Sequence, residues 1–193
     1  MNSNLAYQDD AWKKRREELI DGEVVMMSPA ATNHTFTASN IYYLFAHYLR
    51  GKKCTPIADG TTVYLTDKDH LVPDFMVVCD RDKIKRNGVH GTPDLVVEVL
   101  SPSTAKNDRS HKKDAYERSG VPEYWIVDLS NRSVEVYLLE DGRYKLDNIY
   151  ILYSAEELED MTDEEKTALV TEFKCHLYDD LIIRLDDIFY DLI

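Results

Sequence analysis

Residues 93–101 read PDLVVEVLS, and this apolar run, rich in β-branched residues, decides the fold, with Asp94 at its start and Glu98 inside it. Because apolar side chains stand on both faces, the run predicts a strand inside a sheet that is covered on both sides. A second run at 71–80, LVPDFMVVCD, has the same character, with Asp74 inside it and Asp80 at its end. Together they predict neighbouring buried strands, with Asp74 in one and Glu98 in the other.

The segments outside these strands predict three helices. Apolar residues recur at helical spacing over 32–51, which indicates a long helix before the first buried strand. A polar helix is expected at 103–119, where Ser103-Thr104 can cap its start and Gly120 follows its end. Residues 155–172 predict a third helix, which is strongly acidic.

Shorter strand-forming runs complete the pattern. Residues 18–30 predict a strand or a hairpin around Asp21-Gly22, and Asp141-Gly142 separates two further runs, which is typical of a hairpin turn. Residues 55–67 predict a small antiparallel ribbon, 80–91 a charged loop, and 123–129 a further strand. The order of helix, antiparallel strands, central strand, helix and strand indicates a mixed α/β sandwich rather than a regular βαβ array.

Length and charge limit the organisation of the chain. With 193 residues and 44% apolar composition, it can bury one substantial core. We therefore expect one domain over 1–193, with its core at about 18–130 and a hairpin and acidic extension at 131–193. The net charge of −13 is uneven, because residues 1–130 hold 17 Lys and Arg against 19 Asp and Glu, whereas 131–193 hold 6 against 17. The acidity therefore argues against nucleic-acid contact mainly in the C-terminal third.

Several classes of protein find no support. No run approaches the roughly 18 apolar residues of a membrane-spanning helix, and the polar N-terminus lacks the apolar centre of a secretory signal. We therefore expect a cytoplasmic protein without a membrane partner. Cys54, Cys79 and Cys175 are odd in number and form no CxxC pair, which favours three reduced thiols. A glycine-rich nucleotide-binding loop is also missing from the sequence.

Asp74 and Glu98 are the first candidates for chemistry. An ionised carboxylate in an apolar strand is unfavourable unless a cation or donors compensate it, so the two acids suggest a shared metal ion. Hard oxygen ligands select Mg²⁺ or Mn²⁺, and protein-bound Mg²⁺ commonly contacts substrate phosphate. The alternative is that both acids lie at strand ends, wet or paired with arginine. Asp94 shares a strand face with Glu98 by alternation and could join them, or could simply start the strand.

A lysine is placed to assist these acids. Asp108, Lys112 and Tyr116 are four residues apart and so line one helix face. Because this helix follows the strand of Glu98, Lys112 could point back at that acid and stabilise the charge of an attacked phosphate. The alternative is an ordinary surface Asp–Lys pair, worth roughly 0.2–0.5 kcal/mol.

Other residues are secondary candidates. His34 lies on the core-facing stripe of the first helix, where a buried core histidine is the more ordinary interpretation. The alternative is that His34, together with Glu23 on the preceding strand, lies near the two acids. Two basic clusters could contact phosphate, and a solvated face is the alternative for each. The clusters are Lys83, Lys85 and Arg86, and Lys106, Arg109 and Lys113 together with the helix lysine above.

Several motifs together resemble a known family, the Uma family of restriction-endonuclease-like proteins in the PD-(D/E)XK nuclease superfamily. The similar runs are ELIDGEVVMMSP (18–29), LVPDFMVV (71–78), PDLVVEVLSPST (93–104), DRSHKKDAY (108–116) and GVPEYWIVD (120–128). Near the end, LIIRLDDIF (181–189) is similar to the family's usual C-terminal end.

The resemblance implies an α/β, restriction-endonuclease-like core of helix, three strands, helix and strand, with an added β-hairpin and a C-terminal extension. It makes Asp74 and Glu98 the motif acids and the metal ligands. Where the superfamily signature has lysine two residues after the glutamate, this chain has Leu100. The resemblance therefore implies that Lys112, in the pattern D-R-x-x-K-x-x-x-Y, takes the catalytic role of that lysine. The segment 155–172 matches nothing in the family pattern.

The implied function is a Mg²⁺-dependent or Mn²⁺-dependent endonuclease that hydrolyses phosphodiester bonds of nucleic acid, with DNA expected before RNA. The sequence does not determine the oligomeric state, and a homodimer is one candidate assembly, because dimers are common among folds that cut two strands. The alternative is a catalytically inactive nuclease fold that binds nucleic acid or protein. Leu100 and the acidic total charge motivate that alternative.

Overall fold

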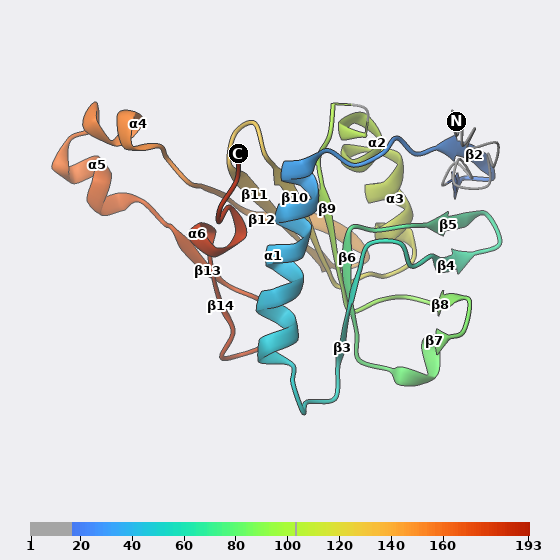
Figure 1. Ribbon diagram of the computed structural model, residues 1–193. Coiled ribbons are helices and arrows are strands. Elements are labelled where there is room, and N and C mark those ends of the chain that lie inside the picture. Colours follow the sequence, from blue (N-terminus) through green and yellow to red (C-terminus); the bar gives the residue numbers. More distant parts are fainter. Residues whose placement is uncertain (1–16, 103) are drawn as a thin grey trace, which may run out of the picture.

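The computed structural model describes residues 17–102 and 104–193, and a six-stranded mixed sheet forms its centre (Figure 1). The strand order is β12-β11-β10-β9-β6-β3, in which β9 and β10 run parallel and the other neighbours run antiparallel. The strands are β3 (Thr55–Ala58), β6 (Phe75–Val78), β9 (Leu95–Val99), β10 (Glu123–Asp128), β11 (Ser133–Glu140) and β12 (Arg143–Ile151). The two predicted buried strands are therefore β6 and β9, which pair directly.

Helices cover both faces of this sheet. Leu95 and Val97 of β9 belong to the core that includes α1 (Thr32–Tyr48), whereas Val96 belongs to the core that includes α3 (His111–Arg118). Successive strand residues point to opposite faces, so the two helices lie on opposite sides of the sheet. The order α1, β3, β6, β9, α3 and β10 is the predicted core of helix, three strands, helix and strand.

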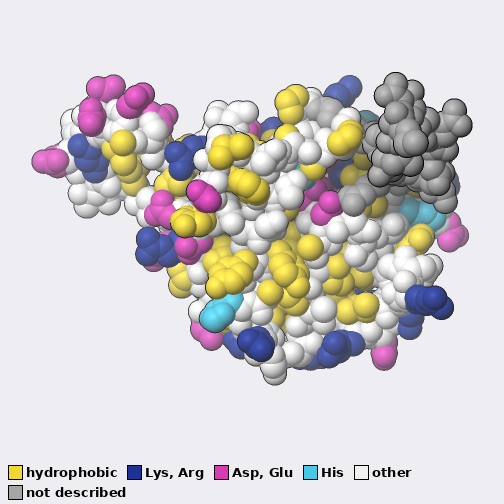
Figure 2. Space-filling view, viewed as in Figure 1, with side chains coloured by type: hydrophobic (Ala, Val, Ile, Leu, Met, Phe, Trp, Pro, Cys, Tyr) yellow, Lys and Arg dark blue, Asp and Glu magenta, His cyan; other side chains and the backbone are white. Residues whose placement is uncertain are grey.

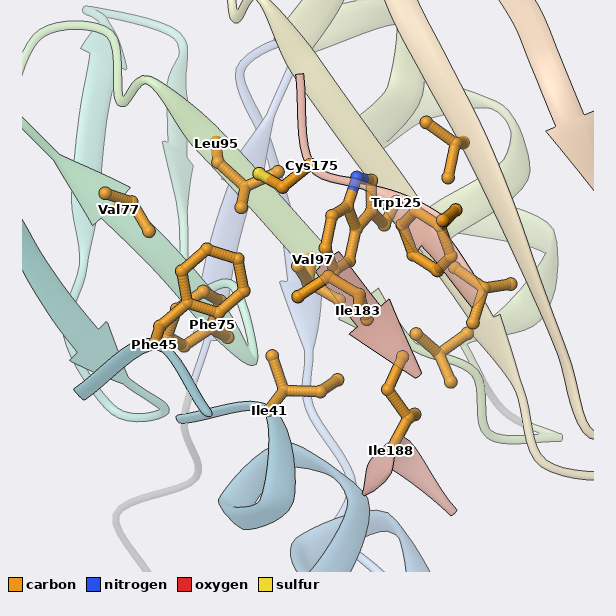
Figure 3. Packing of buried hydrophobic residues seen from close by; sticks show 14 of the residues in the cluster. Ile41, Phe45, Phe75, Val77, Leu95, Val97, Trp125, Cys175, Ile183 and Ile188 are labelled. Atoms are coloured by element: carbon orange, nitrogen blue, oxygen red, sulfur yellow. The ribbon is translucent and has the colours of Figure 1, made fainter. Parts of the chain in front are cut away.

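Aromatic rings fill the core on the α1 side (Figure 3). The ring centroid of Phe45 lies 4.9 Å from that of Phe75 and 5.8 Å from that of Trp125, distances typical of packed aromatic pairs. The C-terminal segments of the chain are β13 (Glu172–Lys174), β14 (Ile182–Arg184) and α6 (Leu185–Ile188). They pack against this core through side chains that include Phe173 and Ile183.

The polar helix predicted at 103–119 is two helices, α2 (Ala105–Arg109) and α3. The break falls at Ser110, whose backbone (φ −128°, ψ −92°) leaves the helical region. Its hydroxyl donates to the carbonyl of Lys106, a local bond through which serine competes with helix continuation. Thr104 stands at the N-cap position without a capping bond from its side chain, and Ser103 lies outside the described residues.

A second six-stranded sheet lies on the α3 side, in the order β2-β1-β5-β4-β8-β7. Its strands are β1 (Glu17–Ile20), β2 (Glu23–Met26), β4 (Val63–Thr66), β5 (Asp69–Leu71), β7 (Ile84–Lys85) and β8 (Gly88–His90). The predicted loop at 80–91 is instead a short 3₁₀ helix, η2 (Arg81–Lys83), followed by the β7–β8 hairpin. The charged residues of this segment concealed the hairpin in the sequence. Glycine is required at position 88 of the hairpin, because a Cβ there would lie 2.3 Å from the carbonyl oxygen of Thr62.

Both predicted hairpin turns are confirmed. Asp21 (φ 53°) and Gly22 (φ 85°) join β1 to β2, and Asp141 (φ 51°) and Gly142 (φ 75°) join β11 to β12. Both central residues have positive φ in each turn, which is the geometry that matches the twist of a two-residue hairpin.

The predicted acidic helix at 155–172 is two short helices, α4 (Ala155–Glu159) and α5 (Asp163–Ala168). Ser154 caps the start of α4 and Thr162 caps the start of α5, each with a capping box. A new helix therefore begins at Thr162, and the segment is not one continuous helix. In Figure 1 these helices extend away from the sheets, and Figure 2 shows acidic side chains gathered on them.

The expectation of three reduced thiols is wrong for two of them, because Cys54 and Cys79 form a disulfide. In the antiparallel pairing of β3 with β6, Thr55 stands opposite Val78, so the next residues outward face each other. Cys175 is free and buried. Within the described ranges no helix is long and apolar enough to cross a membrane, and the N-terminal segment examined for a secretory signal lies largely outside those ranges.

Candidate active site

The strand register brings Asp74 and Glu98 together. Phe75 of β6 stands opposite Val97 of β9, so continuing the antiparallel register by one step sets Asp74 opposite Glu98. Both acids share the α3-facing side of the sheet with Val96, by alternation. They are only 7% and 2% exposed, so both carboxylates are largely withdrawn from water.

Asp74 is held from two sides. Its Oδ2 accepts a hydrogen bond from the backbone N–H of Val99 at 2.7 Å and lies 3.2 Å from Nε2 of His34 on α1. Burial lowers the pKa of His34, but the hydrogen bond to Asp74 and its charge outweigh burial and raise that pKa above its ordinary value. The core-facing side of α1 therefore does more than pack against the sheet, because it also places the imidazole of His34 beside Asp74.

Glu98 receives its partners from α3. Its Oε1 accepts from Nζ of Lys112 at 3.0 Å and from the hydroxyl of Tyr116 at 2.8 Å. Burial raises the pKa of Glu98 well above its ordinary value, and the charge of Lys112 opposes that rise.

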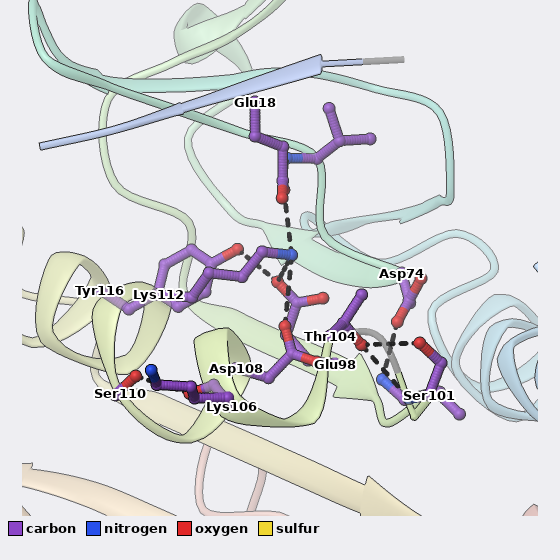
Figure 4. Close-up of polar contacts among 12 residues, drawn as sticks. Glu18, Asp74, Glu98, Ser101, Thr104, Lys106, Asp108, Ser110, Lys112 and Tyr116 are labelled. Carbon is purple, nitrogen blue, oxygen red and sulfur yellow. Dashed lines mark hydrogen bonds and ion pairs between the residues drawn. The ribbon is translucent and has the colours of Figure 1, made fainter. Parts of the chain in front are cut away.

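Lys112 is itself surrounded by acids (Figure 4). Besides Glu98, its Nζ lies 2.9 Å from Oε1 of Glu18 and 3.5 Å from Oδ1 of Asp108, and the side chain is 3% exposed. Burial lowers the pKa of Lys112, but the charges of Glu98, Glu18 and Asp108 outweigh it and raise the pKa well above the ordinary value. Lys112 is therefore a fixed cation in the middle of an acidic pocket.

Leu100 stands where the superfamily signature has its lysine. It is 7% exposed and packs in the α3-side core, on the same face of the strand as Glu98. The ammonium that reaches Glu98 therefore comes from α3 across this apolar side chain.

Glu18 was missed from the sequence. It lies on β1, and its Oε1 also accepts from the backbone N–H of Val72 at 2.8 Å. In the structure Glu18 and Ile20 are both buried and lie on the inner face of β1. From this hairpin the sequence singled out Glu23 instead, because the charged residues beside Glu18 give no sign that it is buried.

Two other acids lie apart from this cluster. Glu23 is exposed on β2, the edge strand of the second sheet. Asp94 precedes β9, at the opposite end from Glu98, and its Oδ2 accepts from the backbone N–H of Cys79 at 2.7 Å. Asp108, by contrast, is 1% exposed beside the lysine, and burial raises its pKa despite the opposing ammonium charge.

The first basic cluster lies on η2 and the β7–β8 hairpin. Nζ of Lys83 donates to the carbonyl oxygen of Thr92 at 2.8 Å, whereas Lys85 and Arg86 are exposed. The latter two side chains are the ones in this cluster that solvent reaches freely.

The second basic cluster is largely committed within the protein. Arg109 lies 3.2 Å from Asp128 and 2.7 Å from Glu135, measured between guanidinium nitrogen and carboxylate oxygen. Nζ of Lys113 lies 3.5 Å from the ring centroid of Tyr137, and burial lowers the pKa of this lysine. Lys106 is exposed on α2.

Comparison with known proteins gives sequence relatives. The Uma2 family, described as "Putative restriction endonuclease", matches residues 7–169. Two proteins of Synechocystis sp. (strain ATCC 27184 / PCC 6803 / Kazusa), both described as uncharacterized, are similar. The first, slr1290, is 29% identical over 144 residues, which cover 71% of this chain and 75% of that protein. The second, sll1609, is 25% identical over 126 residues, which cover 63% and 71%.

A solved structure gives the fold. The crystal structure of a putative nuclease belonging to DUF820 from Anabaena variabilis ATCC 29413 superposes with a TM-score of 0.62 at 16% sequence identity, over 91% of this chain and 90% of that one. The likeness confirms the restriction-endonuclease-like fold that the family resemblance implied. Because the family match spans well over half of the sequence, the chain belongs to the Uma2 family of restriction-endonuclease-like proteins.

Proposed function

We propose that this protein hydrolyses phosphodiester bonds of nucleic acid, with DNA as the expected substrate and Asp74, Glu98 and Lys112 as the reactive centre. The observation that carries the proposal is the juxtaposition of two buried carboxylates on paired strands, with an ammonium 3.0 Å from one of them. Membership of a family described as restriction endonuclease supports the reaction class.

The charge of the cluster fits a divalent cation. Three carboxylates, those of Glu18, Glu98 and Asp108, lie within 3.5 Å of the ammonium of Lys112, and the charge of Asp74 also acts on it. Buried anions in such excess require a proton or another cation, and the raised pKa of Glu98 means that this acid retains its proton more readily than an exposed glutamate.

Oxygen donors of this kind suit Mg²⁺ or Mn²⁺. Asp74 and Glu98 would hold the ion, which when bound supplies Lewis-acid polarisation of the phosphate and of the attacking water. Among the described residues no group of three or more His, Cys, Asp or Glu is arranged as a complete metal site. Two protein carboxylates are nevertheless enough for Mg²⁺, which commonly completes its shell with water and substrate phosphate.

The chain's own residues supply the remaining functions. Lys112 keeps its charge at neutral pH, because its acidic neighbours raise its pKa, and so it can stabilise the negative charge that develops on an attacked phosphate. Glu18 and Asp108 hold the ammonium in place, and the hydroxyl of Tyr116 fixes the orientation of Glu98. Burial of the cluster strengthens each of these electrostatic contacts.

The test is cleavage of single-stranded DNA, duplex DNA and RNA in the presence of Mg²⁺ or Mn²⁺. We expect Asp74→Asn and Glu98→Gln to lower the cleavage rate at least about a hundredfold, a loss of about 2.7 kcal/mol of transition-state stabilisation. Asp94→Asn is the matched control, because its amide oxygen can still accept the bond from Cys79 outside the cluster. Cleavage that survives Asp74→Asn would refute the assignment.

Metal binding separates an enzyme from an inactive nuclease fold. Calorimetric titration with Mn²⁺ should give a binding signal for the wild-type protein that is lost in Glu98→Ala. A protein that binds nucleic acid but neither binds Mn²⁺ nor cleaves would instead be the non-catalytic module.

A further inference from the structure

An open cavity of about 150 Å³ lies beside the reactive centre, between the start of α1 and the end of β3. Three of its lining residues, Ala30, Ala38 and Ala58, have the smallest side chain that still carries a Cβ, and this leaves the space open. Tyr42 adds an aromatic ring to the lining and is 39% exposed, so its ring is accessible.

His34 links the cavity to the proposed site. This residue lines the cavity, and its Nε2 lies 3.2 Å from Oδ2 of Asp74. A group seated in the cavity would therefore be separated from the reactive carboxylate by one imidazole ring.

The polar lining favours a neutral group that carries N–H donors. The hydroxyls of Thr35 and Ser39 donate to the helix carbonyls of Ala31 and Thr35, so their lone pairs are available to accept. Asp59 also lines the cavity, and its negative charge acts on His34. That charge disfavours a phosphate in this position.

The size of the cavity suits one ring system. Drug-sized ligands occupy pockets of about 300–1,000 Å³, whereas a cavity of about 150 Å³ in another protein accepts a single benzene molecule. We propose that this cavity receives one unpaired nucleobase of the strand whose phosphate lies at Asp74 and Glu98. The inference rests on the proposed function and narrows its substrate class to single-stranded or locally opened nucleic acid, because a base inside an intact duplex cannot reach such a cavity.

The test measures binding separately from cleavage. In a Glu98→Gln background, fluorescence anisotropy would follow the binding of a labelled single-stranded deoxyoligonucleotide of about ten nucleotides and of the same sequence as a duplex. We expect Tyr42→Ala to weaken single-strand binding about tenfold, as the loss of one base–aromatic stack does. We expect Ala58→Leu, which fills the cavity from β3, to weaken it similarly.

Tyr43→Ala is the matched control, because Tyr43 is the next residue on α1, is 70% exposed and is not part of the cavity lining. Single-strand binding unaffected by Tyr43→Ala but weakened by both cavity variants supports the inference. Equal effects of Tyr42→Ala and Tyr43→Ala, no effect of either cavity variant, or tighter binding of duplex than of single strand overturns it.

Failure of the inference can be told from failure of the proposed function. Cleavage that depends on Asp74 but is indifferent to Tyr42→Ala and Ala58→Leu rejects the base cavity and leaves the nuclease intact. A wild-type protein that binds no oligonucleotide and cleaves none rejects both.

Discussion

Replacing Lys112 by methionine keeps a long side chain but removes the positive charge that lies 2.9 Å from Glu18, 3.0 Å from Glu98 and 3.5 Å from Asp108. All four side chains are at most 4% exposed, so water cannot replace the lost ammonium without opening the structure. Breaking a buried ion pair by removing one partner typically costs about 3–5 kcal/mol, because it leaves uncompensated charge. We expect Lys112→Met to lower the free energy of unfolding by about that amount at pH 8.

The penalty should depend on pH. Burial raises the pKa of Glu98 and the ammonium opposes the rise, so the pKa of Glu98 climbs further in the variant. A native pKa above the unfolded value, about 4.3, means that the native state binds more protons, and stability then falls as pH rises from that value through the native pKa. The variant should therefore lose less stability at pH 5 than at pH 8.

Urea denaturation followed by circular dichroism measures both effects. Lys106→Met is the control, because Lys106 is exposed on α2 and its loss should change stability by no more than about 0.5 kcal/mol. A loss below about 1 kcal/mol for Lys112→Met, or one independent of pH, would mean that Lys112 behaves like an exposed surface pair and that the buried network does not exist as described.

Three further predictions concern the surroundings of this network. His34→Gln should cost more stability at pH 6 than at pH 9 in urea denaturation, because the raised pKa of His34 beside Asp74 gives a stabilisation that is present below the unfolded pKa and lost as pH rises through the native one. Tyr116→Phe should cost about 1–3 kcal/mol in the same assay, because a buried carboxylate loses one hydrogen-bond donor. Cys54→Ser should lower stability by about 3 kcal/mol under oxidising conditions and far less with reductant present, because the bond to Cys79 closes a loop with a sequence separation of 25; equal losses in both conditions would contradict this.

Patterns of local spacing predicted most of the candidate site. The two apolar runs predicted neighbouring buried strands for Asp74 and Glu98, and the four-residue spacing set Lys112 and Tyr116 on one side of a helix. The positions of these two helix residues depend only on the helix period, which a sequence displays directly. The break at Ser110 did not disturb them, because it precedes the lysine.

Features that depend on how distant segments meet could not be predicted in the same way. Glu18 enters the cluster only because β1 pairs with β5 over the α3 side of the central sheet, and its charged surroundings gave no sign of burial. The disulfide between Cys54 and Cys79 follows from the register of β3 against β6. Glu23 directly follows the Asp21-Gly22 turn and lies exposed on the edge strand β2.

The position of the ammonium on α3 rather than two residues beyond Glu98 has a consequence for assembly. A lysine in the strand would be in place as soon as β6, β9 and β10 pair, whereas Lys112 arrives only when its helix docks over Leu100. Without the docked helix, the paired strands would hold these acids without their counter-charge, and the mutual repulsion of the acids would oppose compaction at neutral pH. Docking of α3 thus covers the apolar face of the sheet and also brings Lys112 to the acids. Packing of the core and assembly of the candidate site therefore depend on the same contact.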